Sequence, residues 1–194
     1  MKKEKIESVL ISVFNKDGIS NLCNELHKKN ITIYSTGGTK KFIEKLNIPV
    51  KSVEALTGYP SILSGRVKTL HPKVFGSILS RSSNEKDILD QETYEIPKIN
   101  FVIVDLYPFK ETRNNTNDEN QIIEKIDIGG VSLIRAAAKN YNDVLVVSSK
   151  TQYNNVLESL KLNNFFTEVE LRKKYASEAF NLISKYDIDI SNYF

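Results

Sequence analysis

Residues 31–46 read Ile-Thr-Ile-Tyr-Ser-Thr-Gly-Gly-Thr-Lys-Lys-Phe-Ile-Glu-Lys-Leu, and this stretch decides the fold class. Its β-branched and aromatic start predicts a strand over residues 31–35. After two glycines, Thr39 is the expected N-cap of a helix whose apolar residues Phe42, Ile43 and Leu46 share one face. A strand that passes through a glycine turn into a helix is typical of a parallel α/β sheet.

The same alternation continues along the chain. Apolar runs at 9–14, 101–106 and 144–148 predict further strands, and most are continuous, which favours burial on both faces. Helical spacing is found at 19–30, 118–125, 131–139, 152–161 and 168–186. We expect residues 54–81 to form a functional loop or to contain structure that the pattern does not detect. We expect residues 110–117 to form a solvated loop. We expect one α/β domain over residues 1–194, a layered, mainly parallel sheet flanked by helices, with a C-terminal helical segment at about 165–190.

Composition narrows the class of protein. The 194 residues are 40% hydrophobic and 26% charged, as in a soluble globular protein. A net charge of +3 argues against a nucleic-acid binder, although a local basic cleft for a phosphorylated small molecule is compatible with it. Cys23 is the only cysteine, which excludes an intramolecular disulfide, and with two histidines no metal site is expected. The apolar runs are too short to span a membrane, so we expect a cytoplasmic protein.

The turn at residues 35–39 is the first candidate site. Glycines let the backbone approach an anion, and the first N–H groups of the following helix point at it. The hydroxyls of Thr36 and Thr39 would add donors. The alternative is a plain strand-to-helix turn.

Polar residues follow the other predicted strands at the same edge of the sheet. Lys16 follows the first strand, and Tyr107 the third, where its phenol can donate a proton. Lys16 can equally be a solvated turn residue, and Tyr107 a core aromatic.

Two further clusters carry charge. In Gly65–Pro72, Arg66 can bind a phosphate through two N–H groups, and Lys68 can neutralise developing negative charge. His71 in the same segment is better explained as a structural residue. In residues 127–132, Asp127 is either a helix cap or a reactive carboxylate. The paired glycines 129 and 130 expose N–H groups suited to an oxyanion.

Four segments together resemble one known family. Ser-Thr-Gly-Gly-Thr (35–39), GRVKTLHP (65–72), LYPF (106–109) and DIGGVSLIRAAAKN (127–140) are similar to the IMP cyclohydrolase domain, the N-terminal half of the bifunctional purine biosynthesis protein. The similarity runs from about residue 9 to 194, so the chain is expected to stop where the transformylase half would begin. The resemblance implies a methylglyoxal-synthase-like fold and closure of the purine ring, from the formamido-imidazole-carboxamide ribotide to IMP and water, without cofactor or metal.

The resemblance also implies the roles of individual residues. It places Lys68, Tyr107, Asp127 and Lys139 around the reacting carboxamide and formyl groups. Our own hypothesis adds that Lys139 pairs with Asp127 and tunes its charge. The resemblance assigns the phosphate and nearby parts of the nucleotide to Ser12, Lys16, Thr36, Gly37, Gly38, Thr39, Arg66 and Thr69. We expect Ser35, Gly129 and Gly130 to be binding residues as well.

Departures and rival functions accompany the resemblance. The family often has serine and aspartate where this chain has Phe14 and Asn15, and asparagine in place of Asp105. A methylglyoxal synthase acting on dihydroxyacetone phosphate and a non-catalytic nucleotide-binding module share the same fold. A homodimer and an AICAR transformylase as functional partner are both compatible with the resemblance.

Overall fold

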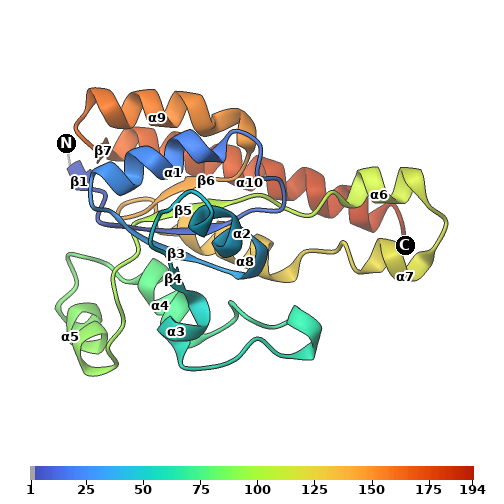
Figure 1. Cartoon of the computed structure of the whole chain (residues 1–194), viewed down its shortest axis with the longest axis horizontal. Coiled ribbons are helices and arrows are strands. Elements are labelled where there is room, and N and C mark those ends of the chain that lie inside the picture. The colour runs from blue at the N-terminus through green and yellow to red at the C-terminus, as the bar shows by residue number, and fades with distance from the viewer. Residues whose placement is uncertain (1–2) are drawn as a thin grey trace.

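A five-stranded parallel sheet forms the centre of the molecule, as the computed structural model of residues 3–194 shows (Figure 1). Its order is β4-β3-β2-β5-β6, and all four neighbouring pairs are parallel. The strands are β2 (Ser8–Ser12), β3 (Thr32–Ser35), β4 (Lys51–Ser52), β5 (Phe101–Val104) and β6 (Leu145–Val147). The predicted α/β class and all four predicted strands are confirmed. The two-residue β4 was missed because it has no apolar run.

Both faces of the sheet are covered. Consecutive residues of a strand point to opposite faces, yet Val9, Leu10 and Ile11 are all 0% exposed. Helices α1 (Ile19–Lys28) and α9 (Tyr153–Leu162) pack against each other along the sheet (Figure 1). Helix α8 (Ile128–Lys139) contacts β5 and β6, and also α4 (Pro72–Leu79) and α10 (Val169–Ser191). The continuous apolar runs therefore predicted the burial of the strands correctly.

The segments predicted as loops contain helices. Residues 54–81 hold most of α3 (Val53–Thr57), the single turn η1 (Leu63–Gly65) and α4. Residues 110–117, expected to be a solvated loop, lie mostly in α6 (Phe109–Asn115), so that prediction is wrong. Only Phe109 of α6 is buried, and a polar helix with one apolar anchor leaves no periodic signal.

The remaining elements are short. They are β1 (Lys3–Lys5), which pairs antiparallel with β7 (Phe166–Glu168), and α2 (Gly37–Glu44), α5 (Glu85–Thr93), α7 (Glu119–Ile123) and η2 (Lys150–Gln152).

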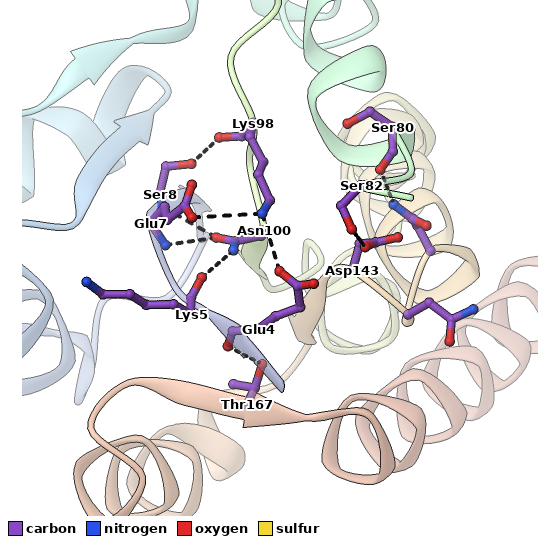
Figure 2. Close-up of polar contacts among 12 residues, drawn as sticks. Glu4, Lys5, Glu7, Ser8, Ser80, Ser82, Lys98, Asn100, Asp143 and Thr167 are labelled. Atoms are coloured by element: carbon purple, nitrogen blue, oxygen red, sulfur yellow. Dashed lines mark hydrogen bonds and ion pairs between the residues drawn. The ribbon is translucent and has the colours of Figure 1, made fainter. Parts of the chain in front are cut away.

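A polar network holds the amino ends of the central strands (Figure 2). The Asn100 amide nitrogen donates to the carbonyl of Lys5 at 2.6 Å, and its oxygen accepts from the N–H of Glu7 at 3.0 Å. The Ser8 hydroxyl donates to the carbonyl of Lys98, whose amine lies 3.3 Å from the carboxylate of Glu4. These contacts fix the amino ends of β2 and β5 relative to each other. Most of the functional residues predicted from the sequence lie at the other end of these strands.

Candidate active site

A cavity of about 500 Å³ opens at the carboxyl ends of β2 and β5. These two strands are neighbours, but the chain leaves β2 toward β3 and leaves β5 toward β6, so the sheet order reverses between them. Open α/β sheets bind ligands at such a switch point. The volume suits a small organic ligand. Most of the predicted site residues line this cavity: Ser12, Lys16, Thr36, Gly38, Thr39, Arg66, Lys68, Thr69, Tyr107, Asp127, Gly129 and Gly130.

The glycine turn opens α2 as expected, but with a different cap. Thr36 is the N-cap, and its side chain makes no capping hydrogen bond, so the N–H groups of Gly37 and Gly38 are available to an anion. Thr39 was predicted to be the cap and is not. It lies inside the first turn, where its hydroxyl accepts from the N–H of Val13 at 3.1 Å and donates to the carbonyl of Val13 at 2.9 Å. Thr39 therefore fastens the helix to the end of β2.

Two residues of the same turn do not line the cavity. Ser35 is fully buried, and its hydroxyl donates to the carbonyl of Ile11 at 2.7 Å, so it joins β3 to β2 and is not placed to bind a ligand. Gly37 has a φ of +37°, which a residue with a side chain rarely adopts, so the turn needs a glycine here, and Gly37 can offer a ligand only its backbone N–H. The Ser12 and Thr36 hydroxyls lie 2.9 Å apart at the cavity wall.

Asp127 is a helix cap, one of the two alternatives that the sequence left open, and its position also leaves the second alternative open. It is the N-cap of α8, and its carboxylate accepts from the N–H of Gly130 at 2.6 Å, yet the side chain also lines the cavity. A Cβ on Gly130 would lie 2.5 Å from a carboxylate oxygen of Asp127, and one on Gly129 would lie 3.0 Å from the Thr69 hydroxyl. The paired glycines therefore leave space for the carboxylate and for Thr69.

Burial controls the protonation of the two acids in the cavity. It raises the pKa of the Asp127 carboxyl above its usual value, against the lowering effect of the N–H groups of Gly130 and Tyr107 and of the Lys68 charge. Burial, with a smaller effect of the Asp127 charge, also raises the pKa of the Tyr107 phenol, which therefore stays protonated. The Asp127 carboxylate, which is more basic than usual, can therefore take up one proton, and the protonated Tyr107 phenol can donate another.

The predicted pairing of Lys139 with Asp127 is wrong within this chain. Asp127 caps the start of α8 and Lys139 is the last residue of the same helix. At about 1.5 Å per residue the two lie about 18 Å apart along the helix axis. Lys139 lines a different, mainly apolar hollow beside Phe75 and Phe180. The sequence suggested proximity because one helix carries both residues, although its length separates them.

The loop of residues 63–71 supplies two of the cations of the cavity, Arg66 and Lys68. Arg66 lies 3.6 Å from Glu124, which directly follows α7 and also lines the cavity. Lys68 lines the cavity, and its positive charge acts to lower the pKa of Asp127. His71 caps α4, and its Nδ1 accepts from the N–H of Lys73 at 3.2 Å, so its interpretation as a structural histidine is confirmed.

Asp105 has a structural role. Its carboxylate accepts from the backbone N–H of Phe14 and, at 3.0 Å, from that of Asn15. It thereby fixes the loop after β2, while burial raises its pKa. Tyr186 of α10 was not among the predicted residues, although its hydroxyl accepts from the N–H of Asp127 at 2.9 Å and donates to the carbonyl of Lys125 at 2.7 Å. Contacts between residues about 60 positions apart leave no local signal in a sequence.

Residues 3–194 contain no group of three or more His, Cys, Asp or Glu side chains arranged to hold a metal ion. In the same part of the chain no helix is both long and apolar enough to cross a membrane.

Comparison with known proteins now defines the class. The chain belongs to the MGS-like domain family, whose pattern matches residues 18–132. Residues 137–194 match the AICARFT/IMPCHase bienzyme family. The predicted methylglyoxal-synthase-like fold and the resemblance to the IMP cyclohydrolase domain are both confirmed.

Three relatives illustrate the match. The bifunctional purine biosynthesis protein PurH of Bacteroides thetaiotaomicron is 52% identical over 193 residues, which cover all of this chain and 38% of that protein. PurH of Clostridium perfringens strain SM101 is 45% identical over 185 residues, 95% of this chain and 36% of that protein. The chain thus spans little more than a third of these relatives, in their N-terminal part. The crystal structure of ForH superposes with a TM-score of 0.84 at 30% identity, covering 95% of this chain and 94% of that one.

Proposed function

We propose that this chain is an IMP cyclohydrolase that closes the purine ring of the formamido-imidazole-carboxamide ribotide, giving IMP and water. One observation carries the proposal. A single cavity of nucleotide size holds the uncapped start of α2 together with Lys68, Tyr107 and Asp127. The similarity to PurH over the whole chain supports the same substrate.

The phosphate would bind at the start of α2. The N–H groups of Gly37 and Gly38 are the first of the helix and the Thr36 hydroxyl lies beside them. The glycosyl-linked ring would then extend toward the start of α8. Since both reacting groups belong to one molecule, much of the acceleration would come from holding the carboxamide nitrogen against the formyl carbon.

The ring closes by one addition and one elimination. The carboxamide nitrogen bonds to the formyl carbon and loses a proton, for which the buried Asp127 carboxylate is the proposed acceptor. The formyl oxygen becomes an oxyanion, which Lys68 and the N–H of Gly129 would stabilise, since the N–H of Gly130 is already bound to Asp127. Loss of the second nitrogen-bound proton and departure of the protonated oxygen as water complete the ring. Tyr107 is the proposed donor because its phenol stays protonated. Lys139 has no part in this scheme.

Turnover of the formylated ribotide, followed by its ultraviolet absorbance, tests the proposal. The purified chain should form IMP, and Lys68→Ala should lower kcat on the order of 10²-fold. The absence of IMP formation by folded wild-type chain would contradict the proposal. Production of methylglyoxal from dihydroxyacetone phosphate would instead establish the rival lyase, and IMP binding without turnover would establish a binding module. An AICAR transformylase partner, a homodimer and a cytoplasmic location stay predictions.

A further inference from the structure

Lys125 is a lysine of the cavity wall that is held by two aromatic rings. Its Nζ lies 5.3 Å from the centre of the Phe14 ring and 5.6 Å from that of Tyr107. The two rings themselves meet edge to face, with centres 5.5 Å apart and planes at 77°. Both Nζ distances lie within the range of cation–π attraction. We call Phe14, Tyr107 and Lys125 the aromatic bracket.

The charge of Lys125 is not neutralised by an ion pair among the described residues, whereas other cations of the cavity are engaged. The Lys16 amine donates to the carbonyls of Val13 at 2.8 Å and Phe14 at 2.7 Å, and Arg66 faces Glu124. Ring faces attract an ammonium group but take up few of its three N–H donors. Lys125 therefore combines a full charge with donors available to a ligand oxygen.

The backbone of Lys125 is fixed as well. The Tyr186 hydroxyl donates to the carbonyl of Lys125 and accepts from the N–H of Asp127, so one side chain of α10 holds the backbone on both sides of Ile126. With its backbone bound to α10 and its ammonium bound by two rings, Lys125 loses less freedom on contacting a ligand than an unrestrained lysine would.

The bracket lines the same cavity as the turn that opens α2. Phe14 follows the end of β2, where the Ser12 hydroxyl contacts that of Thr36 at 2.9 Å. We propose that Lys125 is a further substrate-binding residue whose ammonium, positioned by Phe14 and Tyr107, binds the phosphate oxygens of a nucleoside monophosphate. This proposal rests on the proposed function for the identity of the nucleotide.

Binding of IMP, measured by calorimetry at low and moderate salt, tests the proposal. Lys125→Met keeps most of the apolar stem and removes the charge. It should raise the Kd for IMP about tenfold, as expected for a lost charge-assisted hydrogen bond, and make Kd less dependent on salt. In turnover, KM should rise and kcat should change little. Lys86→Met is the matched control, since Lys86 is an exposed residue of α5 outside the cavity.

Phe14→Leu tests the bracket itself. It should weaken IMP binding in the wild-type background and have a smaller effect in the Lys125→Met background, because its part in the contact is to position the ammonium. A Kd for Lys125→Met within twofold of wild type, or a weaker Kd with an unchanged salt dependence, would overturn the role of Lys125 while leaving the proposed function intact. Failure of the folded wild-type chain to bind IMP would overturn both.

Discussion

Replacement of Asp127 by asparagine separates the two roles of this residue. The carboxylate caps α8 through the N–H of Gly130 and also lines the cavity as the proposed proton acceptor. Asparagine caps helices about as well as aspartate, but its amide cannot act as a base. Asp127→Asn should therefore preserve the fold and abolish most of the activity.

The two effects differ greatly in size. Losing the charge at the helix start costs about 0.3–1 kcal/mol of folding free energy. Burial raises the pKa of Asp127 in the folded chain, so the stability that its protonated form contributes is lost as the pH rises through that raised pKa. At neutral pH the wild type therefore bears the free-energy cost of keeping a buried carboxylate ionised. The asparagine variant has no such cost, and this gain offsets the loss of the charge at the helix start. The net change should stay within about 1 kcal/mol, or about 2–4 °C in Tm. Loss of a general base lowers kcat about 10²–10⁴-fold.

The assay compares ultraviolet-monitored turnover with thermal unfolding for three proteins. The matched control is Asp118→Asn, because Asp118 caps α7 through the N–H of Gln121 at 3.3 Å and does not line the cavity. The control should keep wild-type turnover, whereas Asp127→Asn should lose it at nearly unchanged Tm. Turnover within threefold of wild type for Asp127→Asn would refute its role as base. A fall in Tm of more than 10 °C would show that asparagine does not replace aspartate as the cap of α8.

Four further outcomes are expected. Gly130→Ala places a Cβ 2.5 Å from the Asp127 carboxylate and should lower kcat by at least about tenfold, measured by turnover; an unchanged kcat would contradict the tight packing there. Glu124→Gln frees Arg66 and should tighten IMP binding about two- to fivefold by calorimetry, with little effect on Tm because the pair is exposed; weaker binding would argue that Glu124 positions Arg66. Because burial raises the pKa of Cys23 to about 12, its thiol should resist a disulfide reagent at pH 8 until the chain is unfolded in denaturant; rapid reaction of the native protein would contradict its burial. The rate of cyclisation should fall with decreasing pH through a pKa above that of an ordinary aspartate, recorded as a pH profile of kcat/KM; a flat profile would exclude Asp127 as the titrating base.

The sequence predicted the elements that apolar patterns control. The runs around Leu10 and Val102 and the helix face of Ile19 and Leu22 are continuous or periodic, and all four residues are fully buried. The sequence also predicted that the site residues meet at one edge of the sheet, because parallel strands have their carboxyl ends on the same edge. Lys68, Tyr107 and Asp127 do line one cavity there.

What the sequence left undetermined depends on distances that it does not encode. The length of α8 separates Lys139 from Asp127, although the two share one helix. Thr39 bonds to Val13 and does not cap its helix, since the cap depends on where the turn starts. Lys125 and Tyr186 reach the site through contacts across distant parts of the chain, and neither lies in a local pattern that indicates a ligand.

A crystal structure of the chain with IMP tests the central claim most directly, since it places the phosphate and the base in one experiment. We predict the phosphate at the start of α2, against the N–H groups of Gly37 and Gly38, with the hypoxanthine ring between Lys68 and Asp127. A nucleotide bound away from this edge of the sheet, with the glycine turn unoccupied, would contradict the account.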